Sequence, residues 1–250
     1  MQKLFFLFLF FTFLSCHQKS NSNLTVAAAA NIQFAIRDVI SEFEKTHPIK
    51  TDLIIGSSGK LTAQIKQGAP YDVFLSADKK YPNALFDSKK AIQSPAVYVK
   101  GNLTIWTNKN LIINNLSDLL RPEFRKIAIA NPKTAPYGRE AESALRNAGI
   151  LEAIKHKLVF GENIAQTNQY ILSGTCDVGI TAASTAYAKT INQKGHWVEV
   201  DPTLYALIEQ GVVITVHGHQ IHSKESKQFF DFLFSESAKT IFAQYGYQVE

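Results

Sequence analysis

The chain has 250 residues, enough for one large domain or two of ordinary size, and its 46% hydrophobic and 19% charged residues are typical of a soluble globular protein. The 26 basic and 21 acidic residues give a formal net charge of +5, and the basic residues are scattered along the chain. Because it has neither a dense basic run nor an aromatic stacking motif, the sequence argues against nucleic-acid binding.

The N-terminal segment is typical of a targeting signal. Lys3 supplies a positive charge, and residues 4–14 are almost purely Phe and Leu. That run is shorter than the roughly 20 residues of a transmembrane helix but suits a signal peptide. A small residue precedes Cys16, as in a bacterial lipobox, although Phe13 departs from the usual leucine. We therefore expect residues 1–16 to be a signal peptide with lipidation at Cys16; an ordinary cleaved leader is the alternative.

Two further features of the sequence are a polar segment after the signal peptide and a second cysteine far along the chain. Residues 17–23 are polar and rich in Ser and Asn, as expected of a flexible tether. Cys176 is the second of two cysteines, so lipidation or removal of Cys16 leaves it without an intramolecular partner. Cys176 leads into an apolar strand, and we expect a small buried side chain there.

From residue 24 onward, short apolar runs alternate with amphipathic patterns. A helix beginning at Asn31 carries apolar residues at i, i+3 and i+4 spacing, and His47-Pro48 ends it. Strands are expected at residues 24–28, 51–55, 73–75, 103–107, 126–130, 178–181 and 212–216. Further helices are expected at residues 58–67, 138–147, 151–156, 164–172, 227–234 and 238–245. Buried strands that alternate with helices indicate an α/β fold with mainly parallel sheets.

Three strand-to-helix junctions carry small or polar residues: residues 27–31 (AAAAN), 56–59 (GSSG) and 135–138 (APYG). Ligands of open α/β sheets bind at the carboxyl ends of strands, where helix N-termini offer unpaired N–H groups. Neutral donors of this kind can hold a desolvated dianion, each bond contributing roughly 1.5–3 kcal/mol. Asn31 and Ser58 also suit simple helix caps, so the junctions support capping and anion binding about equally.

Several segments resemble the periplasmic molybdate-binding proteins of bacterial ABC importers. The resemblance rests on residues 24–31 (LTVAAAAN), 56–61 (GSSGKL) and 64–78, with residues 67–78 (QGAPYDVFLSAD) as its most specific piece. Matching segments continue as far as residues 241–247, so the resemblance covers almost all of residues 24–250.

The resemblance implies a type II periplasmic binding protein fold, with two α/β lobes of mainly parallel sheets, flanking helices and a hinge. Lobe 1 would comprise residues 24–100 and 201–250, and lobe 2 residues 101–200, with crossings near Lys100 and Asp201. The implied function is non-enzymatic, extracytoplasmic binding of molybdate or tungstate and its delivery to the permease of an ABC transporter. We expect a monomer without a cofactor in the periplasm, anchored to the membrane if Cys16 is lipidated.

The resemblance also implies which residues hold the dehydrated anion between the lobes. These are Asn31, Ser58, Tyr137, Ile164 and Ala30. Asn31 and Ser58 match polar donors of the family, and Ile164 matches an apolar residue that donates its backbone N–H. Some relatives have a tyrosine hydroxyl at the position of Ala182, and we expect Tyr137 to supply that missing donor.

Two alternatives remain open. A receptor for sulfate or phosphate would use the same kind of donors. A secreted zinc-dependent hydrolase would use His217, His219 and His222, whose spacing permits zinc binding if the side chains converge, although a solvated loop is the simpler expectation. Asp72 and Asp78 flank an expected buried strand, and we interpret them as charges that stabilise a helix or hinge.

Overall fold

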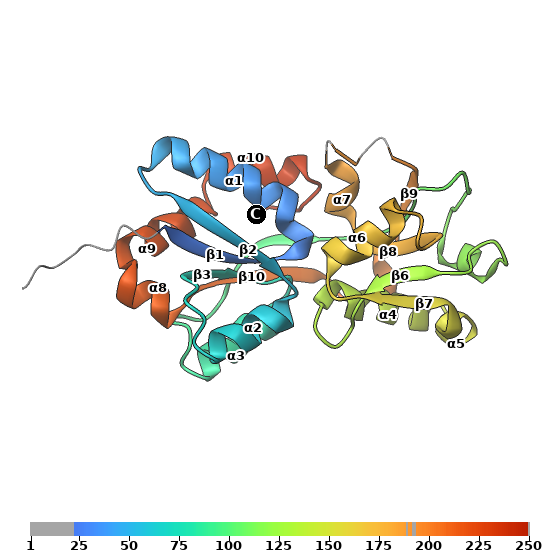
Figure 1. Cartoon of the computed structure of the whole chain (residues 1–250), viewed down its shortest axis with the longest axis horizontal. Coiled ribbons are helices and arrows are strands. Elements are labelled where there is room, and N and C mark those ends of the chain that lie inside the picture. Colours follow the sequence, from blue (N-terminus) through green and yellow to red (C-terminus); the bar gives the residue numbers. More distant parts are fainter. Residues whose placement is uncertain (1–22, 189, 192–193, 250) are drawn as a thin grey trace, which may run out of the picture.

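The structure, a computed structural model, describes residues 23–188, 190–191 and 194–249. The signal peptide, Cys16 and nearly all of the tether lie outside these residues. Within them, no helix is both long enough and apolar enough to cross a membrane. The described chain forms two halves that lie side by side, each built around one sheet (Figure 1).

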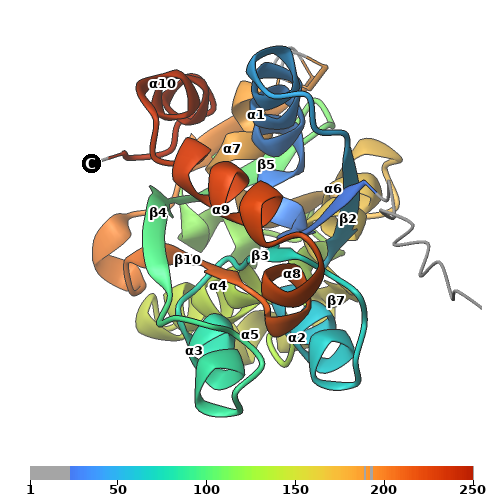
Figure 2. The same cartoon turned by 90° about the vertical axis from the view of Figure 1, so that its left-hand side faces the viewer.

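In the described part of the chain, the sheet of the first half has the strand order β2-β1-β3-β10-β4. Its strands are β1 (Leu24–Ala29), β2 (Thr51–Gly56), β3 (Val73–Leu75), β4 (Ala96–Gly101) and β10 (Ile208–Ile214). Its helices are α1 (Gln33–Thr46), α2 (Ser58–Lys66), α3 (Lys80–Asp87), α8 (Val216–Ile221), α9 (Ser223–Phe232) and α10 (Glu236–Gln244), with a 3₁₀ turn η1 (Ala30–Ile32) before α1. Helices α1 and α10 cover one face of this sheet, and α2 and α3 cover the other (Figure 2).

The second half repeats the pattern with the order β7-β6-β8-β5-β9 among the described strands. These are β5 (Leu103–Thr107), β6 (Ile127–Ala130), β7 (Leu158–Gly161), β8 (Val178–Ala182) and β9 (His196–Glu199). Its helices are α4 (Pro136–Asn147), α5 (Leu151–Ile154), α6 (Ile164–Leu172) and α7 (Ala183–Tyr187), with short 3₁₀ turns η2 (Leu116–Leu120), η3 (Lys155–Lys157) and η4 (Pro202–Leu204).

Both sheets are mixed, whereas the alternation of strands and helices predicts mainly parallel ones. In the first half β1 pairs in parallel with β2 and β3, while β10 runs antiparallel to β3 and β4. In the second half β6 pairs in parallel with β7 and β8, while β5 runs antiparallel to β8 and β9. The antiparallel strands are the ones that border the two crossings between the halves.

The chain crosses from the first sheet to the second between β4 and β5, and it returns between β9 and β10. These crossings lie close to Lys100 and Asp201, where they are expected, but the exact lobe boundaries stay a prediction. An antiparallel bridge between Lys100 and Gln248 also holds the C-terminal segment beside the end of β4.

Each half has its own apolar core. In the first half, the buried face of α1 includes Val39 and Phe43, and the Phe43 ring meets the Phe229 ring edge-on at 5.1 Å between centroids. The aromatic residues of the C-terminal region contribute to this core: Phe229 and Phe242 are fully buried, and Phe230, Phe232 and Phe234 pack against it partly buried. Cys176 is buried and free, which confirms the expectation of a small buried side chain.

Candidate anion-binding site

A small cavity lies between the two halves. The first half lines it with residues 29–31, 56–58 and Ala77, and the second half lines it with residues 135–137 and 163–164. Its empty volume is about 190 Å³, open solvent included. All five residues singled out from the sequence lie on its wall: Ala30, Asn31, Ser58, Tyr137 and Ile164.

Four helical segments of the described chain begin at this cavity. They are η1, which leads into α1, and α2 from the first half, with α4 and α6 from the second. The N–H groups of a first helical turn have no acceptor within the helix, and the helix dipole places partial positive charge there. Because the four N-termini meet from both sides, the cavity concentrates donors and positive potential without a cation.

Neither Asn31 nor Ser58 is a helix cap, so the simpler interpretation of these residues is wrong. The N-cap of η1 is Ala29 and that of α1 is Ile32, and neither makes a side-chain capping bond. The N-cap of α2 is Ser57, whose hydroxyl accepts from the backbone N–H of Lys60. Ser58 is the first residue of α2 and Asn31 is the second residue of η1, so the side chains of both are available to other partners.

The hydroxyl of Ser58 is held in place by its neighbours. Its Oγ accepts a hydrogen bond from the backbone N–H of Ala77 at 3.0 Å, and the residue is 1% exposed. An oxygen that accepts in this way still has its own proton to donate. Since Ser58 lines the cavity, the backbone of Ala77 prepares it as a donor.

Asn31 is held by a buried polar network. Its Nδ2 donates to Gln210 Oε1 at 2.8 Å and to the Tyr247 hydroxyl at 3.1 Å. Its backbone carbonyl accepts from Ser184 Oγ at 2.9 Å and from the Tyr247 hydroxyl at 3.0 Å. Sequence reasoning missed Gln210; its signal is an uncharged polar residue within the apolar strand β10, where it is fully buried.

Tyr137 belongs to the first turn of α4, and its side chain is 2% exposed. Its hydroxyl accepts a hydrogen bond from Gln210 Nε2 at 3.1 Å. Burial raises the pKa of Tyr137 well above the usual tyrosine value, so the hydroxyl stays protonated. A side chain at Gly101 would clash with this hydroxyl, so the close approach of β4 to Tyr137 requires glycine there.

Ala182 is fully buried but is not among the residues that line the cavity. It is the N-cap of α7 and makes no side-chain capping bond. Two residues further on, the Ser184 hydroxyl donates a hydrogen bond to the carbonyl of Asn31, and Ser184 is not among the residues that line the cavity. The role of Tyr137 as a replacement for a donor at position 182 stays a prediction.

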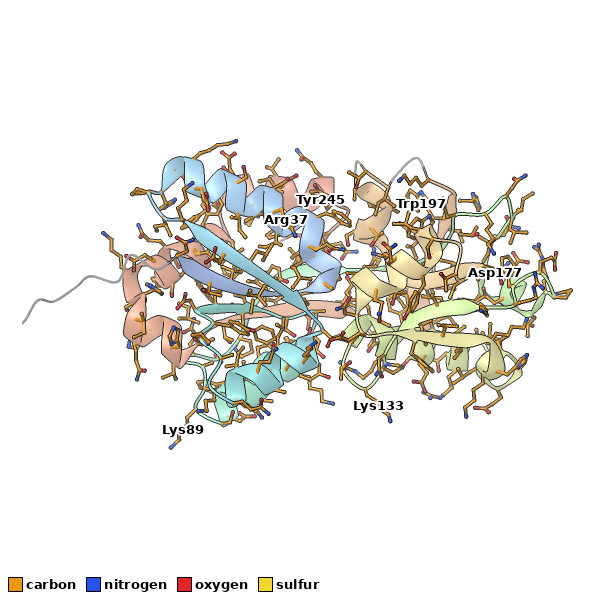
Figure 3. All side chains as sticks on the ribbon, viewed as in Figure 1. Arg37, Lys89, Lys133, Asp177, Trp197 and Tyr245 are labelled. Carbon is orange, nitrogen blue, oxygen red and sulfur yellow. The ribbon has the colours of Figure 1, made fainter. Side chains whose placement is uncertain are left out.

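Contacts between the halves surround the cavity. The backbone N–H of Gly59 donates to the Thr134 carbonyl at 2.9 Å, and the Tyr81 hydroxyl donates to the Lys133 carbonyl at 3.2 Å. Lys133 lies where the two halves meet (Figure 3). Two ion pairs also bridge the halves: Lys60–Glu162, at 2.6 Å, and Arg139–Asp78. The structure is therefore a closed form, in which the cavity is enclosed by both halves.

The histidine motif does not lie in a solvated loop, because it occupies α8 and the residue after it. His222 Nδ1 lies 3.1 Å and His217 Nε2 lies 3.7 Å from Oδ1 of Asp72, whereas His219 Nδ1 lies 3.5 Å from Ser223 Oγ. Asp72 is fully buried and also accepts from the backbone N–H of Thr25 at 2.6 Å. Of the three histidines, only His222 is thus within hydrogen-bond distance of this carboxylate, and His217 stays partly exposed. The described residues contain no group of three or more potential metal ligands.

Asp72 and Asp78 do not act as a pair. Asp72 binds the histidines, and Asp78 forms the bridge to Arg139. The interpretation of both as stabilising charges agrees with these contacts.

Comparisons with known proteins agree with this architecture. Residues 24–248 match the model of the family described as bacterial extracellular solute-binding protein. The chain is 33% identical over 231 residues to the molybdate-binding protein ModA of Azotobacter vinelandii, covering 92% of this chain and 91% of that protein. It is 29% identical over 243 residues to a putative ABC transporter substrate-binding lipoprotein of Bacillus subtilis, covering 94% and 90%.

A solved structure shares the fold. The periplasmic molybdate-binding protein of Azotobacter vinelandii superposes with a TM-score of 0.84 at 29% identity, covering 91% of this chain and all of the other. The fold is therefore the two-lobed α/β fold of periplasmic binding proteins. Together, these matches show that the chain belongs to the bacterial extracellular solute-binding protein family.

Proposed function

We propose that this protein binds molybdate or tungstate outside the cytoplasmic membrane and delivers the anion to the permease of an ABC transporter. The observation that carries the proposal is the meeting of four helix N-termini from both halves at one small cavity. Among the described residues, no Lys, Arg, His, Asp or Glu lines that cavity. A wall of neutral donors suits a dehydrated anion, which it recognises by size and by the directions of its oxygens.

The donors come from the residues that the sequence singles out. Ser58 would donate through its hydroxyl, and Tyr137 and Ile164 through the free N–H groups of the first turns of α4 and α6. Asn31 and Ala30 would complete the wall on the side of η1. Each hydrogen bond to a charged oxygen contributes roughly 1.5–3 kcal/mol, so a few donors from each half can hold a dianion.

The likeness to named relatives supports molybdate as the ligand. The Azotobacter vinelandii relative is named a molybdate-binding protein. Sulfate has the same tetrahedral shape and charge, so it is the rival ligand within this class. The cavity wall lacks a histidine or carboxylate that could activate a nucleophile, which supports a transport role without catalysis.

The same family likeness supports an extracytoplasmic location, since the family is described as extracellular. That the protein is a monomer stays a prediction. The Bacillus subtilis relative is named a lipoprotein, which supports lipidation of Cys16 and membrane anchoring of this chain. Treating intact cells with a lipid-labelling precursor and comparing wild type with Cys16→Ala tests the anchor: label is expected in the wild type alone.

A thermal unfolding screen tests the ligand. A ligand that binds only the folded state raises the unfolding temperature by mass action. Molybdate and tungstate are expected to raise it at micromolar concentrations, and sulfate, phosphate and zinc are not. Stabilisation by sulfate at equal strength would contradict the choice of molybdate, and stabilisation by zinc alone would contradict the proposal.

A further inference from the structure

A row of buried side chains joins the two halves behind the cavity. Tyr98 on β4 donates its hydroxyl proton to Gln210 Oε1 at 3.2 Å, and Asn31 Nδ2 donates to the same oxygen at 2.8 Å. Gln210 Nε2 donates in turn to the hydroxyl of Tyr137, from α4 of the second half, at 3.1 Å. Gln210 is fully buried and lies at the centre of the row.

One atom in this row has no partner. Asn31 Oδ1 is buried without a hydrogen bond, as assessed over the described residues, and Asn31 lines the cavity. A buried polar atom without a partner costs free energy, so native structures rarely leave one. An amide oxygen beside the cavity would also repel an anion, whereas an amide NH₂ would bind it.

The row can run in the opposite direction. If both amide groups rotate by half a turn, Gln210 Nε2 donates to Asn31 Oδ1, and Gln210 Oε1 accepts from Tyr137. The tyrosines allow this because a hydroxyl both donates and accepts. The Tyr98 hydroxyl then accepts from Gln210 Nε2. Burial raises the pKa of Tyr137 well above the usual value, so its hydroxyl retains the proton that it donates to Gln210 Oε1. Asn31 Nδ2 then occupies the place of the unpaired oxygen.

We propose that Gln210 is a positioning residue for the anion, because by donating to Asn31 Oδ1 it turns the Asn31 amide so that its NH₂ group faces the cavity. This inference rests on the proposed function. It explains why an uncharged amide lies within an apolar strand, since an amide carries an NH₂ donor and an oxygen acceptor side by side, and half a turn exchanges the two. It also gives the Tyr137 hydroxyl a role in binding that acts through Gln210.

A double-mutant cycle in anion affinity tests this role. The variants are Gln210→Met, Asn31→Ala and the two combined, and each is titrated with molybdate by calorimetry. The control is Gln64→Met, a substitution of the same kind at a more exposed glutamine of α2. Gln210→Met is expected to weaken binding about tenfold and Asn31→Ala about 10- to 150-fold. The combined variant should bind no more weakly than Asn31→Ala, because Gln210 acts only through Asn31.

Additive losses, or unchanged affinity in Gln210→Met, would overturn the inference. If wild type itself fails to bind molybdate, the proposed function fails instead, so the two failures are distinguishable. If the variants do not fold, an NMR measurement on the wild-type protein still tests the inference. The side-chain NH₂ resonances of Gln210, which does not line the cavity, are expected to shift together with those of Asn31 on addition of molybdate; a Gln210 signal that stays in place contradicts the reversal.

Discussion

At the scale of single residues, the Ser58 hydroxyl shows how backbone can prepare a binding group. Its Oγ accepts from Ala77 N–H at 3.0 Å, and Ala77 also lines the cavity. Ser58→Ala should therefore weaken molybdate binding about 10- to 150-fold, the cost of one charge-assisted donor. Calorimetric titration measures this loss.

Ser226→Ala is the matched control. Ser226 is fully buried in α9, and its hydroxyl has no partner among the described residues. Its removal is expected to leave the affinity unchanged. Equal affinities of the Ser58→Ala protein and the wild type would show that this hydroxyl does not contact the anion.

The sequence could predict some residues of the site and not others, for a physical reason. Asn31 and Ser58 follow closely after β1 and β2, and Tyr137 lies in the first turn of the helix that follows β6, so local patterns of small residues place them at the carboxyl ends of strands. Gln210 lies inside a strand, and its bond to Asn31 joins residues 179 positions apart in the chain. Only the insertion of β10 between β3 and β4 brings them together, and no local pattern encodes that order.

At the scale of elements, the strands that the sequence pattern missed share one property. β4, β7 and β9 each lie at an edge of a sheet. β7 (LVFG) and β9 (HWVE) are only four residues long and only partly buried, and β9 has just two apolar residues at its centre, so neither stands out as the buried central strands do. The central strands β1, β3, β5 and β8 were predictable because burial on both faces makes them largely apolar, with threonine as their polar residue.

Asp177 ties together the ends of elements in the second half, away from the cavity (Figure 3). Its carboxylate accepts from the backbone N–H groups of Arg125 and Lys126, both at 2.8 Å, and pairs with Lys109. Burial alone would raise the pKa of Asp177, but the bonds from Lys109 and the two N–H groups outweigh it and lower the pKa below its usual value. Folding therefore favours the ionised form.

The sign of this shift predicts how stability depends on pH. A lowered pKa in the folded state stabilises the protein above the unfolded-state pKa, about 3.9, and this stabilisation is lost as the pH falls through the folded-state value. Asp177→Asn should lower the free energy of unfolding by about 1–3 kcal/mol at pH 7, and the difference should shrink below about pH 4. Urea unfolding at both pH values measures it.

Asp231→Asn is the control for this experiment. Asp231 pairs with Lys227 one helical turn away, and its side chain is 55% exposed. Exposed pairs contribute little, so this variant should match wild type within about 1 kcal/mol at both pH values. A pH-independent loss in Asp177→Asn would mean that packing, not ionisation, accounts for the effect.

At the scale of the whole molecule, binding and closure are one event. The cavity takes its wall from both halves, so a ligand there favours the closed form through contacts that the open form lacks. Contacts between the halves outside the cavity contribute to the same equilibrium. Removing such a contact is therefore expected to weaken the affinity for the anion, even where no atom of the ligand is touched.

Two ion pairs between the halves make this testable as a matched comparison. In the Lys60–Glu162 pair the side chains are 54% and 50% exposed, whereas in the Arg139–Asp78 pair they are 27% and 16% exposed. Arg139 also lies over the Tyr81 ring, at 5.6 Å from its centroid. The less exposed pair is less screened by solvent, so it should contribute more to closure.

Arg139→Met is accordingly expected to weaken molybdate binding at least about tenfold, because it leaves the carboxylate of Asp78 partly buried without its partner. Lys60→Met removes the same charge but should cost less than about fivefold, and that loss should vanish in about 1 M salt, where charges on the surface are screened. Calorimetric titration of both variants at low and high salt measures the two effects. Because both substitutions remove one positive charge, equal losses that disappear together in salt would mean that general attraction of the anion, and not closure of the halves, is what these residues provide.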